Sequence, residues 1–397
     1  MGRIFKRTRF IKKLLLILII LLSFSKANAL EIKSEKVLLI NLNDNQILID
    51  KNSEEKTSIA SLTKIMTTLV AIENIDNLEE TVKITHDMFD GLAEENLYQV
   101  GLKIFSTPSY NDLLHATLIS SGADATRALT NKYGDIKFVE MMNKKAKELK
   151  LKDTHFSNTI GIDDENHYST LKDVKILLEY ALKNKKFKEI FETKKYVFSD
   201  NSITIESSIK KTGEYFNINT SHIKGGKTGY TFSAGRCLAS IATDEKNNIN
   251  YMLITTNALE SPNHIIDALT IYDYYFENYK YYEIVNKQDV IKKIQTKYSK
   301  TKEIKLKVDE NITLFYDKSF DKKLIKIEYK GLNIVKPNDD IIGKIKIYYD
   351  KKLLYEKEYD NNIEFSIFEF IKSYIFIIIP IILIVSFIFI TKTKKLN

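Results

Sequence analysis

The chain has only one cysteine, Cys237, among its 397 residues. A single cysteine excludes an internal disulfide and leaves too few thiols for a zinc cluster. Histidine offers no better metal site, because His155 and His167 have no third ligand near them, and hydrogen bonding within a loop is the expected role of both. The sequence therefore offers no clear metal site, and Cys237 is expected to be a small buried residue rather than a catalytic thiol.

The chain also lacks a concentrated basic patch, although its formal net charge is +8. Its lysines are scattered among acids, without the stripe of basic and aromatic residues that is typical of nucleic-acid-binding proteins. No nucleic-acid partner is expected, and a basic surface beside an anionic membrane or wall is the milder interpretation. With 44% hydrophobic and 28% charged residues the chain is expected to fold, and its length favours two domains.

The N-terminus has the pattern of an export signal. Six basic residues precede the apolar run Leu14 to Leu22, and Ala27-Asn28-Ala29 offers a cleavage site with small side chains. A retained N-terminal anchor is the alternative, but the apolar run is short for a membrane span. Residues 1–29 are therefore predicted to be a signal peptide, and the mature chain is predicted to start near Leu30, outside the cytoplasm.

A serine and a lysine three residues apart, Ser61 and Lys64, stand at the start of an apolar segment that runs to Ile72. A short helix that is apolar on nearly all sides is usually buried. On one face of such a helix, a partly neutral Lys64 could take the proton of Ser61. Ser-x-x-Lys occurs nine times in this lysine-rich chain, and only at Ser61 does it open a buried-looking helix.

Residues 31–49 precede this helix and are predicted to form two strands around the turn Asn43-Asp44-Asn45. The whole stretch, VLLINLNDNQILIDKNSEEKTSIASLTKIMTTLVAIE, resembles the opening of the D-alanyl-D-alanine carboxypeptidases, the low-molecular-mass penicillin-binding proteins. The resemblance covers about residues 31–279. It implies an α/β (α+β) fold of the penicillin-binding-protein and β-lactamase type, with an antiparallel sheet flanked by helices and a helical subdomain. It also implies that Ser61 is acylated and that Lys64 is its base.

The second motif of this family, Ser-x-Asn, lies in a loop between helices. Residues 75–161 are mostly helical in pattern, and Ser121 matches the first position in the break Ser120 to Ala125. Ala123 stands where the family has an asparagine that contacts the motif lysine and the amide of the substrate. Restoring an asparagine is expected to speed acylation by roughly two- to a hundredfold, unless the loop has repacked around the methyl group. Asp124 is a candidate N-cap for the helix that follows.

A literal Ser-x-Asn occurs at Ser199-Asp200-Asn201, between two strand-like segments. Asp-Asn is ordinary turn chemistry in that position, so a turn is the favoured interpretation. The third family motif is Lys227-Thr228-Gly229, followed by Tyr230 and by two predicted strands. Its second copy, at Lys211-Thr212-Gly213, is interpreted as a solvated turn.

The resemblance gives each residue of the third motif a role. Lys227 and Thr228 on an edge strand would bind the substrate carboxylate, while Gly229 lets the backbone approach closely. The backbone N–H groups of Ser61 and Tyr230 would form the oxyanion hole.

Residues 154–170 also resemble the same family. Thr170 followed by Asp173 predicts a helix N-cap with an acid in the first turn. The class A β-lactamases need a glutamate in the corresponding loop, and Glu165 is the only glutamate in this stretch. Its surroundings match the peptidase loop instead.

The last third of the chain shows no chemistry of its own. Alternating lysine-rich segments predict a small β domain at 281–359, which the family often carries as a stalk. An interfacial segment at 363–373 then leads into 374–390, a run without any charge that is predicted to span a membrane. The following lysines place the tail, 391–397, in the cytoplasm by the positive-inside rule, with the catalytic domain (30–279) outside.

The function implied by the resemblance is a penicillin-sensitive serine D-Ala-D-Ala carboxypeptidase that acts on peptidoglycan stem peptides and is inhibited by β-lactams. Ser61 would attack, Lys64 would take the proton, Ser121 would relay one to the departing D-alanine, and Lys227 would hold the terminal carboxylate. The resemblance implies that this reaction needs no metal and no organic cofactor. Two alternatives remain open. One is a β-lactamase or transpeptidase on the same fold, and the other is a wall-binding protein that has lost activity.

Overall fold

The computed structural model describes residues 30–393, so the predicted signal peptide and the last four residues lie outside the described part of the chain. The chain divides into two compact units between Phe276 and Glu277.

An antiparallel five-stranded sheet is the centre of the first unit, with the strand order β2-β1-β7-β6-β5. The N-terminal hairpin is confirmed, since β1 and β2 pair antiparallel and β1 also pairs with β7. The strands of the sheet are β1 (Lys36–Asn41), β2 (Gln46–Lys51), β5 (Ile223–Thr231), β6 (Gly235–Asp244) and β7 (Ile249–Ala258).

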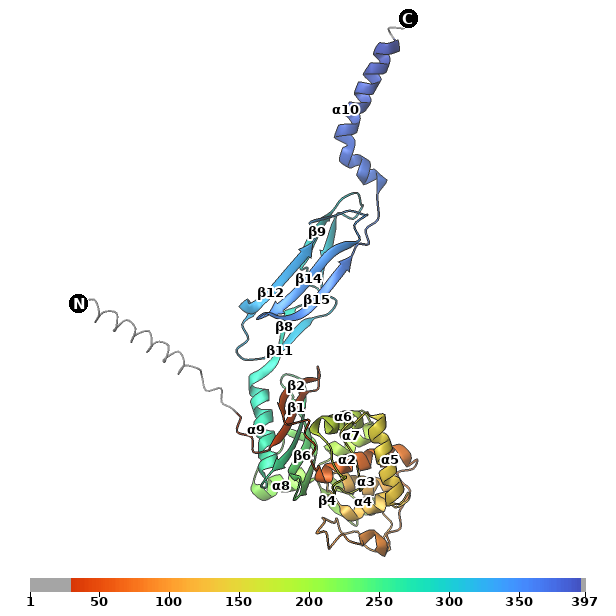
Figure 1. The fold of residues 1–397 in the computed structure, drawn as a ribbon, viewed down its shortest axis with the longest axis vertical. Helices are drawn as coiled ribbons and strands as arrows, with labels where there is room; N and C mark the ends of the chain where they lie inside the picture. The colour runs from red at the N-terminus through yellow and green to blue at the C-terminus, as the bar shows by residue number, and fades with distance from the viewer. Residues whose placement is uncertain (1–29, 394–397) are drawn as a thin grey trace, which may run out of the picture. The chain divides into compact units, whose positions relative to one another are not determined.

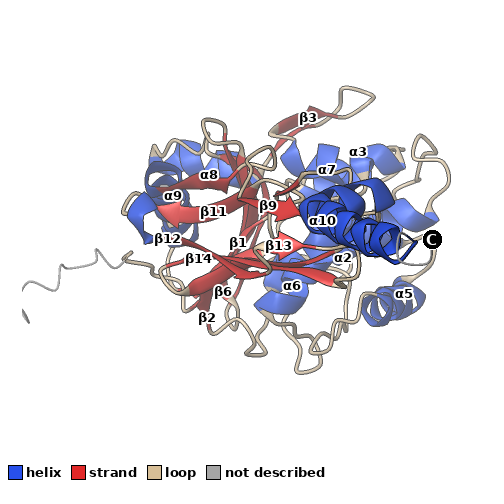
Figure 2. Ribbon diagram, turned by 90° about the horizontal axis from the view of Figure 1, so that it is seen from above, coloured by secondary structure: helices blue, strands red, loops and turns tan. Residues whose placement is uncertain are grey.

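Helices cover both faces of this sheet (Figures 1 and 2). One face carries the long C-terminal helix of the unit, where Tyr272 shares a buried hydrogen bond of 2.9 Å with Ser240 of β6. The other face shares the main hydrophobic core with the helical subdomain. The helices are α2 (Thr63–Asn74), α3 (Tyr110–Leu118), α4 (Ala123–Thr130), α5 (Asp135–Glu148), α6 (Leu171–Ala181), α7 (Lys185–Glu192), α8 (Ser208–Phe216) and α9 (Asn263–Asn278), with 3₁₀ turns η1 (Ala60–Leu62) and η2 (His86–Phe89).

The helix α2 lies in the middle of this core. Every residue from Thr63 to Ala71 is buried, as the apolar pattern predicts. The helical interpretation of residues 75–161 is right for α3, α4 and α5 but wrong for 149–161, which is a loop, and for 75–109. The stretch 75–109 holds only η2 and loops among its described elements, and the backbone N–H of Ala123 in α4 donates 2.8 Å to its Tyr98 carbonyl.

Two predicted helix starts have different outcomes. Thr170 caps α6 as expected, because its side chain accepts a hydrogen bond from the backbone of Asp173. Asp124 is not an N-cap, since Gly122 holds that position in α4. The Asp124 carboxylate instead accepts hydrogen bonds from the backbone N–H groups of residues 100–102 and of Ala125, which ties the long loop to the helix.

The second unit is a lysine-rich β domain followed by a helix. Its core is formed by alternate residues of its strands, as in Ile345 and Ile347. Its elements are β8 (Tyr279–Val285), β9 (Lys292–Thr296), β10 (Glu303–Leu306), β11 (Ile312–Asp317), η3 (Lys322–Leu324), β12 (Ile325–Gly331), β13 (Ile334–Val335), β14 (Ile341–Tyr349), β15 (Lys352–Asp360) and α10 (Ile367–Thr393). Within α10, Ile367–Ile388 is long and apolar enough to cross a membrane, with a mean hydropathy of 2.5 and no residue buried.

Candidate active site

Ser61 and Lys64 come together at the junction of η1 and α2. Ser61 is the central residue of the 3₁₀ turn, and Lys64 is the second residue of the α-helix. The Lys64 ammonium nitrogen lies 3.0 Å from the Ser61 hydroxyl oxygen and donates a second hydrogen bond of 2.7 Å to the carbonyl of Ile160. A serine and a base in direct hydrogen-bond contact have the geometry of an activated nucleophile.

The electrostatics of Lys64 suit a base. The side chain is 1% exposed, and this burial lowers its pKa to about 7. Desolvation disfavours the charged amine, so a large fraction of Lys64 is neutral at neutral pH. Lys227 is fully buried as well, and burial together with repulsion from Lys64 lowers its pKa well below the ordinary value. The site therefore holds two lysines that are not both fully charged.

A chain of hydrogen bonds supports the backbone just before Ser61. The backbone of Ser157 donates to His167 Nδ1, so the proton of this imidazole sits on Nε2, which donates 2.7 Å to the Thr63 hydroxyl. That hydroxyl donates 2.8 Å to the carbonyl of Ala60. Burial lowers the pKa of His167 to about 4, which keeps the ring neutral.

The carbonyl of Ala60 is also in contact with Gly161. Ala60 has φ of 47°, in the left-handed region where a residue with a side chain is strained. A Cβ on Gly161 would lie 2.0 Å from the Ala60 oxygen, so only glycine fits there. His167 and Gly161 thus hold the strained turn that presents Ser61.

Ser121 and Lys227 form the second contact of the site. Lys227 Nζ donates 2.8 Å to the Ser121 hydroxyl and 2.6 Å to the carbonyl of Thr228. Ser121 has φ of 67°, a second strained backbone in the same place. Ala123, in the position of the family asparagine, packs its methyl group in an apolar cluster with Leu92 and Ile160. Ala123 also lines the active-site cavity, to which it brings no polar group.

The third motif lies on the edge strand β5, as expected. The Thr228 hydroxyl donates 2.6 Å to the hydroxyl of Ser208 on α8. A Cβ on Gly229 would come within 3.0 Å of the backbone nitrogen of Ser61, so glycine allows the strand and the Ser61 turn to approach closely. Tyr230 follows, with about half of its surface exposed.

A cavity of about 310 Å³ opens over these residues. Ser61, Lys64, Ser121, Thr228, Gly229 and Tyr230 all line it, whereas Lys227 lies beneath its wall. The structure thus brings all seven predicted site residues into one neighbourhood.

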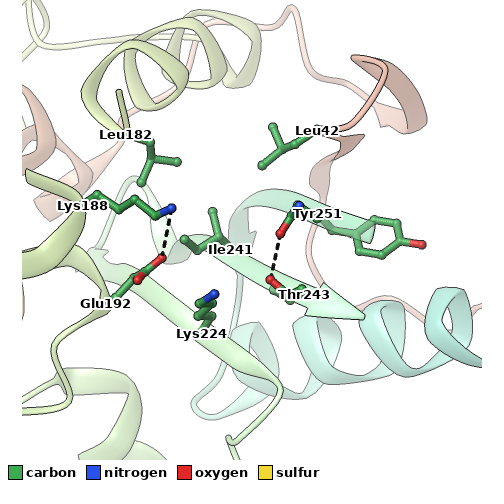
Figure 3. Close-up of a pocket in the computed structure, with 10 residues that line it drawn as sticks. Leu42, Leu182, Lys188, Glu192, Lys224, Ile241, Thr243 and Tyr251 are labelled. Atoms are coloured by element: carbon green, nitrogen blue, oxygen red, sulfur yellow. Dashed lines mark hydrogen bonds and ion pairs between the residues drawn. The ribbon is translucent and has the colours of Figure 1, made fainter. Parts of the chain in front are cut away.

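A second cavity of the same unit, of about 230 Å³, lacks this chemistry (Figure 3). Its Lys188 is paired with Glu192 at 4.0 Å, and its Thr243 hydroxyl donates to the side chain of Asn250. None of the described residues that line it is a serine or a cysteine, so it has no counterpart of the pair Ser61 and Lys64.

The two rejected motif copies have different surroundings, and Thr212 of the second copy lines the active-site cavity. Asn201 is in the hairpin between β3 (Lys195–Val197) and β4 (Thr204–Glu206), so the turn interpretation is confirmed. Lys211 was predicted to lie in a solvated turn, and this is wrong: residues 211–213 belong to α8, because Ser207 caps a helix there. Lys211 Nζ donates 3.0 Å to the hydroxyl of Tyr98.

The predictions for His155 and Cys237 agree with the structure. His155 Nδ1 lies 2.5 Å from the carbonyl of Asn166, within its own loop. Cys237 is buried on β6, and burial raises the pKa of its thiol to about 12, which makes it inert. Within residues 30–393, no group of three or more His, Cys, Asp or Glu side chains could hold a metal ion.

Sequence reasoning missed several residues that line the cavity, among them Arg236 and His264. Arg236 comes from the strand beside the third motif, and His264 comes from the start of α9. One signal was available for Arg236: this chain uses lysine for nearly all its cations, and beyond Arg9 it has only two arginines, Arg127 and Arg236. No signal marks His264.

Comparisons with known proteins agree with this geometry. D-alanyl-D-alanine carboxypeptidase DacF of Bacillus subtilis (strain 168) is 28% identical over 311 residues, which cover 75% of this chain and 76% of the relative. The crystal structure of penicillin-binding protein 5 from Haemophilus influenzae is similar with a TM-score of 0.61 at 23% identity, over 83% of this chain and 98% of that one. The Streptomyces K15 DD-transpeptidase is similar with a TM-score of 0.55 at 28% identity, over 62% of this chain and 98% of that one. The sequence pattern of a peptidase family, S11, described as D-alanyl-D-alanine carboxypeptidase, matches residues 23–259, and the chain belongs to this family of serine hydrolases.

Proposed function

We propose that this protein removes the terminal D-alanine from peptidoglycan stem peptides through an acyl-enzyme on Ser61. The observation that carries the proposal is the contact of 3.0 Å between Ser61 Oγ and Lys64 Nζ, made by a lysine whose pKa is lowered to about 7. A base that is partly neutral at neutral pH can accept the serine proton as the bond to the carbonyl carbon forms.

The remaining residues supply the other parts of the reaction. The backbone N–H groups of Ser61 and Tyr230 stabilise the oxyanion of the tetrahedral intermediate. Ser121, held by Lys227, relays a proton to the amine of the departing D-alanine. Water then attacks the acyl-enzyme and regenerates the Ser61 hydroxyl. β-Lactams acylate the same serine and block it.

Labelling with a fluorescent penicillin, followed by peptide mass mapping, tests the nucleophile. The adduct is expected on Ser61, and Ser61→Ala is expected to abolish labelling. Ser199→Ala is the matched control, because it alters the literal Ser-x-Asn copy, and it is expected to keep the label. An adduct on any other serine would contradict the assignment of Ser61 as the nucleophile.

Release of free D-alanine from a synthetic peptide that ends in D-Ala-D-Ala separates an enzyme from an inactive wall-binding relative. A protein that binds the peptide without releasing D-alanine would contradict the proposal. Rapid turnover of penicillin would indicate a β-lactamase instead. The exposure of Glu165, which does not line the cavity, argues against a glutamate-assisted hydrolysis of the class A type.

Transfer to an amine is the second candidate, because one of the similar solved structures is a DD-transpeptidase. The two reactions share the acyl-enzyme and differ only in whether water or an amine attacks it. Adding an amino-terminal acceptor peptide to the D-alanine release assay and measuring the ratio of hydrolysed to transferred product distinguishes them.

Membrane attachment and export belong to the same proposal. The apolar helix Ile367–Ile388 supports a C-terminal anchor, although it begins before the predicted span at 374–390 and includes part of the predicted interfacial segment. We assign residues 1–29 as the signal peptide, 30–279 as the extracytoplasmic catalytic domain, 281–359 as the stalk and 391–397 as the cytoplasmic tail. A chain that stops at residue 362 is expected to leave the membrane fraction.

A further inference from the structure

The turn between β9 and β10, residues 297–302, is a basic segment of the second unit, and we call it the hairpin tip. It contains three lysines and no acidic residue, and all three lysines are exposed. Lys302 pairs with Glu369 of α10 at 2.6 Å, whereas Lys297 and Lys300 form no ion pair with any residue that the structure describes. The charges of Lys297 and Lys300 are therefore available to an anion outside the chain.

Four contacts hold the hairpin tip against the beginning of α10. The carbonyl of Tyr298 accepts a hydrogen bond of 2.7 Å from the backbone N–H of Ser366. The hydroxyl groups of Tyr298 and Tyr374 share a hydrogen bond of 2.8 Å, and the ring centroid of Phe370 lies 5.1 Å from that of Tyr298. Together with the ion pair to α10, these contacts fix the position of the tip along the helix.

The sequence of α10 sets the depth of this end of the helix in a membrane. Glu369 and Lys372 are its last charged residues before the uncharged run 374–390. At 1.5 Å per residue this run is about 25 Å long as a helix, close to the roughly 30 Å of a hydrocarbon core. With the tail 391–397 in the cytoplasm, Tyr374 stands at the outer boundary of that core, where tyrosine is enriched in membrane proteins.

Tyr298 lies at the same depth as Tyr374, because their hydroxyl groups are hydrogen-bonded. Lys297 and Lys300 are within two residues of Tyr298, so their backbone lies at the level of the lipid headgroups. An ammonium group donates hydrogen bonds to phosphate oxygens, and a lysine near an anionic membrane surface is attracted to it. The apolar stem of a lysine can lie along the hydrocarbon boundary while its charge stays among the headgroups.

We propose that the hairpin tip binds the headgroups of anionic phospholipids, with Lys297 and Lys300 pairing with the lipid phosphates. The site belongs to the β domain and is distinct from the membrane span, so it gives this domain a lipid contact of its own. The inference rests on the proposed membrane attachment and deepens it, because it names the class of lipid that the domain selects.

A single tryptophan at the hairpin tip tests the inference in the full chain, which has no tryptophan of its own. Thr301→Trp places the probe at an exposed position and leaves Tyr298 in place. The chain is reconstituted into vesicles of phosphatidylcholine and phosphatidylglycerol in equal amounts, and quenching is measured when one or the other lipid carries bromine near the headgroup end of its acyl chains. Leu353→Trp is the matched control, because Leu353 is exposed at the end of β15 away from α10, and neither lipid is expected to quench it.

The anionic lipid is expected to associate with the tip roughly 5- to 30-fold more strongly than phosphatidylcholine, which corresponds to one or two lysines at the membrane surface. Lys297→Gln combined with Lys300→Gln, in the chain with the tip probe, is expected to abolish this preference. Lys322→Gln combined with Lys323→Gln removes the same charge from η3, where the carbonyl of Leu324 is bonded to the turn before β15, and is expected to keep the preference.

Equal quenching by the two lipids, or a preference that survives the loss of Lys297 and Lys300, would overturn the inference. A tip probe that neither lipid quenches would overturn it as well, and a change in its emission on addition of soluble polyphosphate would then indicate an anionic wall polymer as the occupant. Flotation separates these results from the proposed function, because a full chain that floats with the vesicles is attached to the membrane whatever the tip binds. A full chain that does not float contradicts the proposed attachment, and the inference then fails with it.

Discussion

The burial of Lys64 makes a quantitative prediction about stability. The substitution Lys64→Met keeps an unbranched side chain of similar length and removes the amine. Folding lowers the pKa of Lys64 from 10.5 to about 7. Each unit corresponds to about 1.4 kcal/mol, so burying this amine costs up to about 5 kcal/mol at pH 7. Because the side chain is fully buried, solvent does not screen this cost.

The sign of the pH dependence follows from proton binding. Between pH 7 and 10.5 the unfolded chain holds the Lys64 proton more tightly than the folded chain does, so the free energy of unfolding rises with pH across this window. The variant Lys64→Met has no amine at this position, so this pH-dependent contribution to its free energy of unfolding is absent. Losing the hydrogen bond to the carbonyl of Ile160 costs the variant about 1–3 kcal/mol at every pH. We therefore expect the variant to be about 2–4 kcal/mol more stable at pH 7 and less stable than the wild type near pH 10.5.

Urea denaturation followed by circular dichroism measures this difference in the detergent-solubilised full chain, which has no tryptophan for a fluorescence assay. The unfolding free energies of wild type and Lys64→Met are compared at pH 7, 8, 9 and 10, so that the titration of other groups cancels. Lys211→Met, at an exposed lysine near the cavity, is the matched control. Its unfolding free energy is expected to change with pH in the same way as that of the wild type. A constant difference between Lys64→Met and wild type from pH 7 to 10 would refute the reasoning.

Three further predictions concern acylation by penicillin. Lys64→Arg is expected to abolish it, since a guanidinium cannot give up its proton, and to lower the stability of the chain, since a permanent charge is then buried; acylation near the wild-type rate would show that the lysine is only structural. The wild-type acylation rate is expected to rise with pH through about 7 and then level off, because Lys64 must lose its proton first, and a rate independent of pH between 5 and 9 would contradict this. Ala123→Asn is expected to slow acylation severalfold and to destabilise the chain by about 1–3 kcal/mol, because it places an amide in the apolar cluster with Leu92; faster acylation would show that the asparagine role is vacant after all.

Local patterns in the sequence were sufficient for much of the fold. The hairpin of β1 and β2, the buried helix α2, the Thr170 cap and the alternating strands of the second unit each depend on neighbours within one element. Periodicity and capping chemistry act over a few residues, so they can be read without knowledge of the tertiary structure. The long loop at 75–109 escaped this reasoning, because contacts with distant segments stabilise it rather than any repeat of its own.

Some features of the site could likewise be predicted from the sequence and others could not. Ser61, Lys64, Ser121 and the motif at Lys227 could be predicted because they recur in a known order along the chain. The pKa of Lys64 could not be given a value, since it depends on how completely the folded chain excludes water from the amine.

Only the tertiary structure decided what surrounds these motifs. It packs the methyl group of Ala123 against Leu92 and Ile160, and it brings Arg236 of β6 and His264 of α9 to one cavity. No local pattern carries this information, because strand pairing and the packing of α9 on the sheet join residues that are far apart in sequence. The order of the motifs thus indicated the reaction, while packing between distant segments decided which side chains line the cavity.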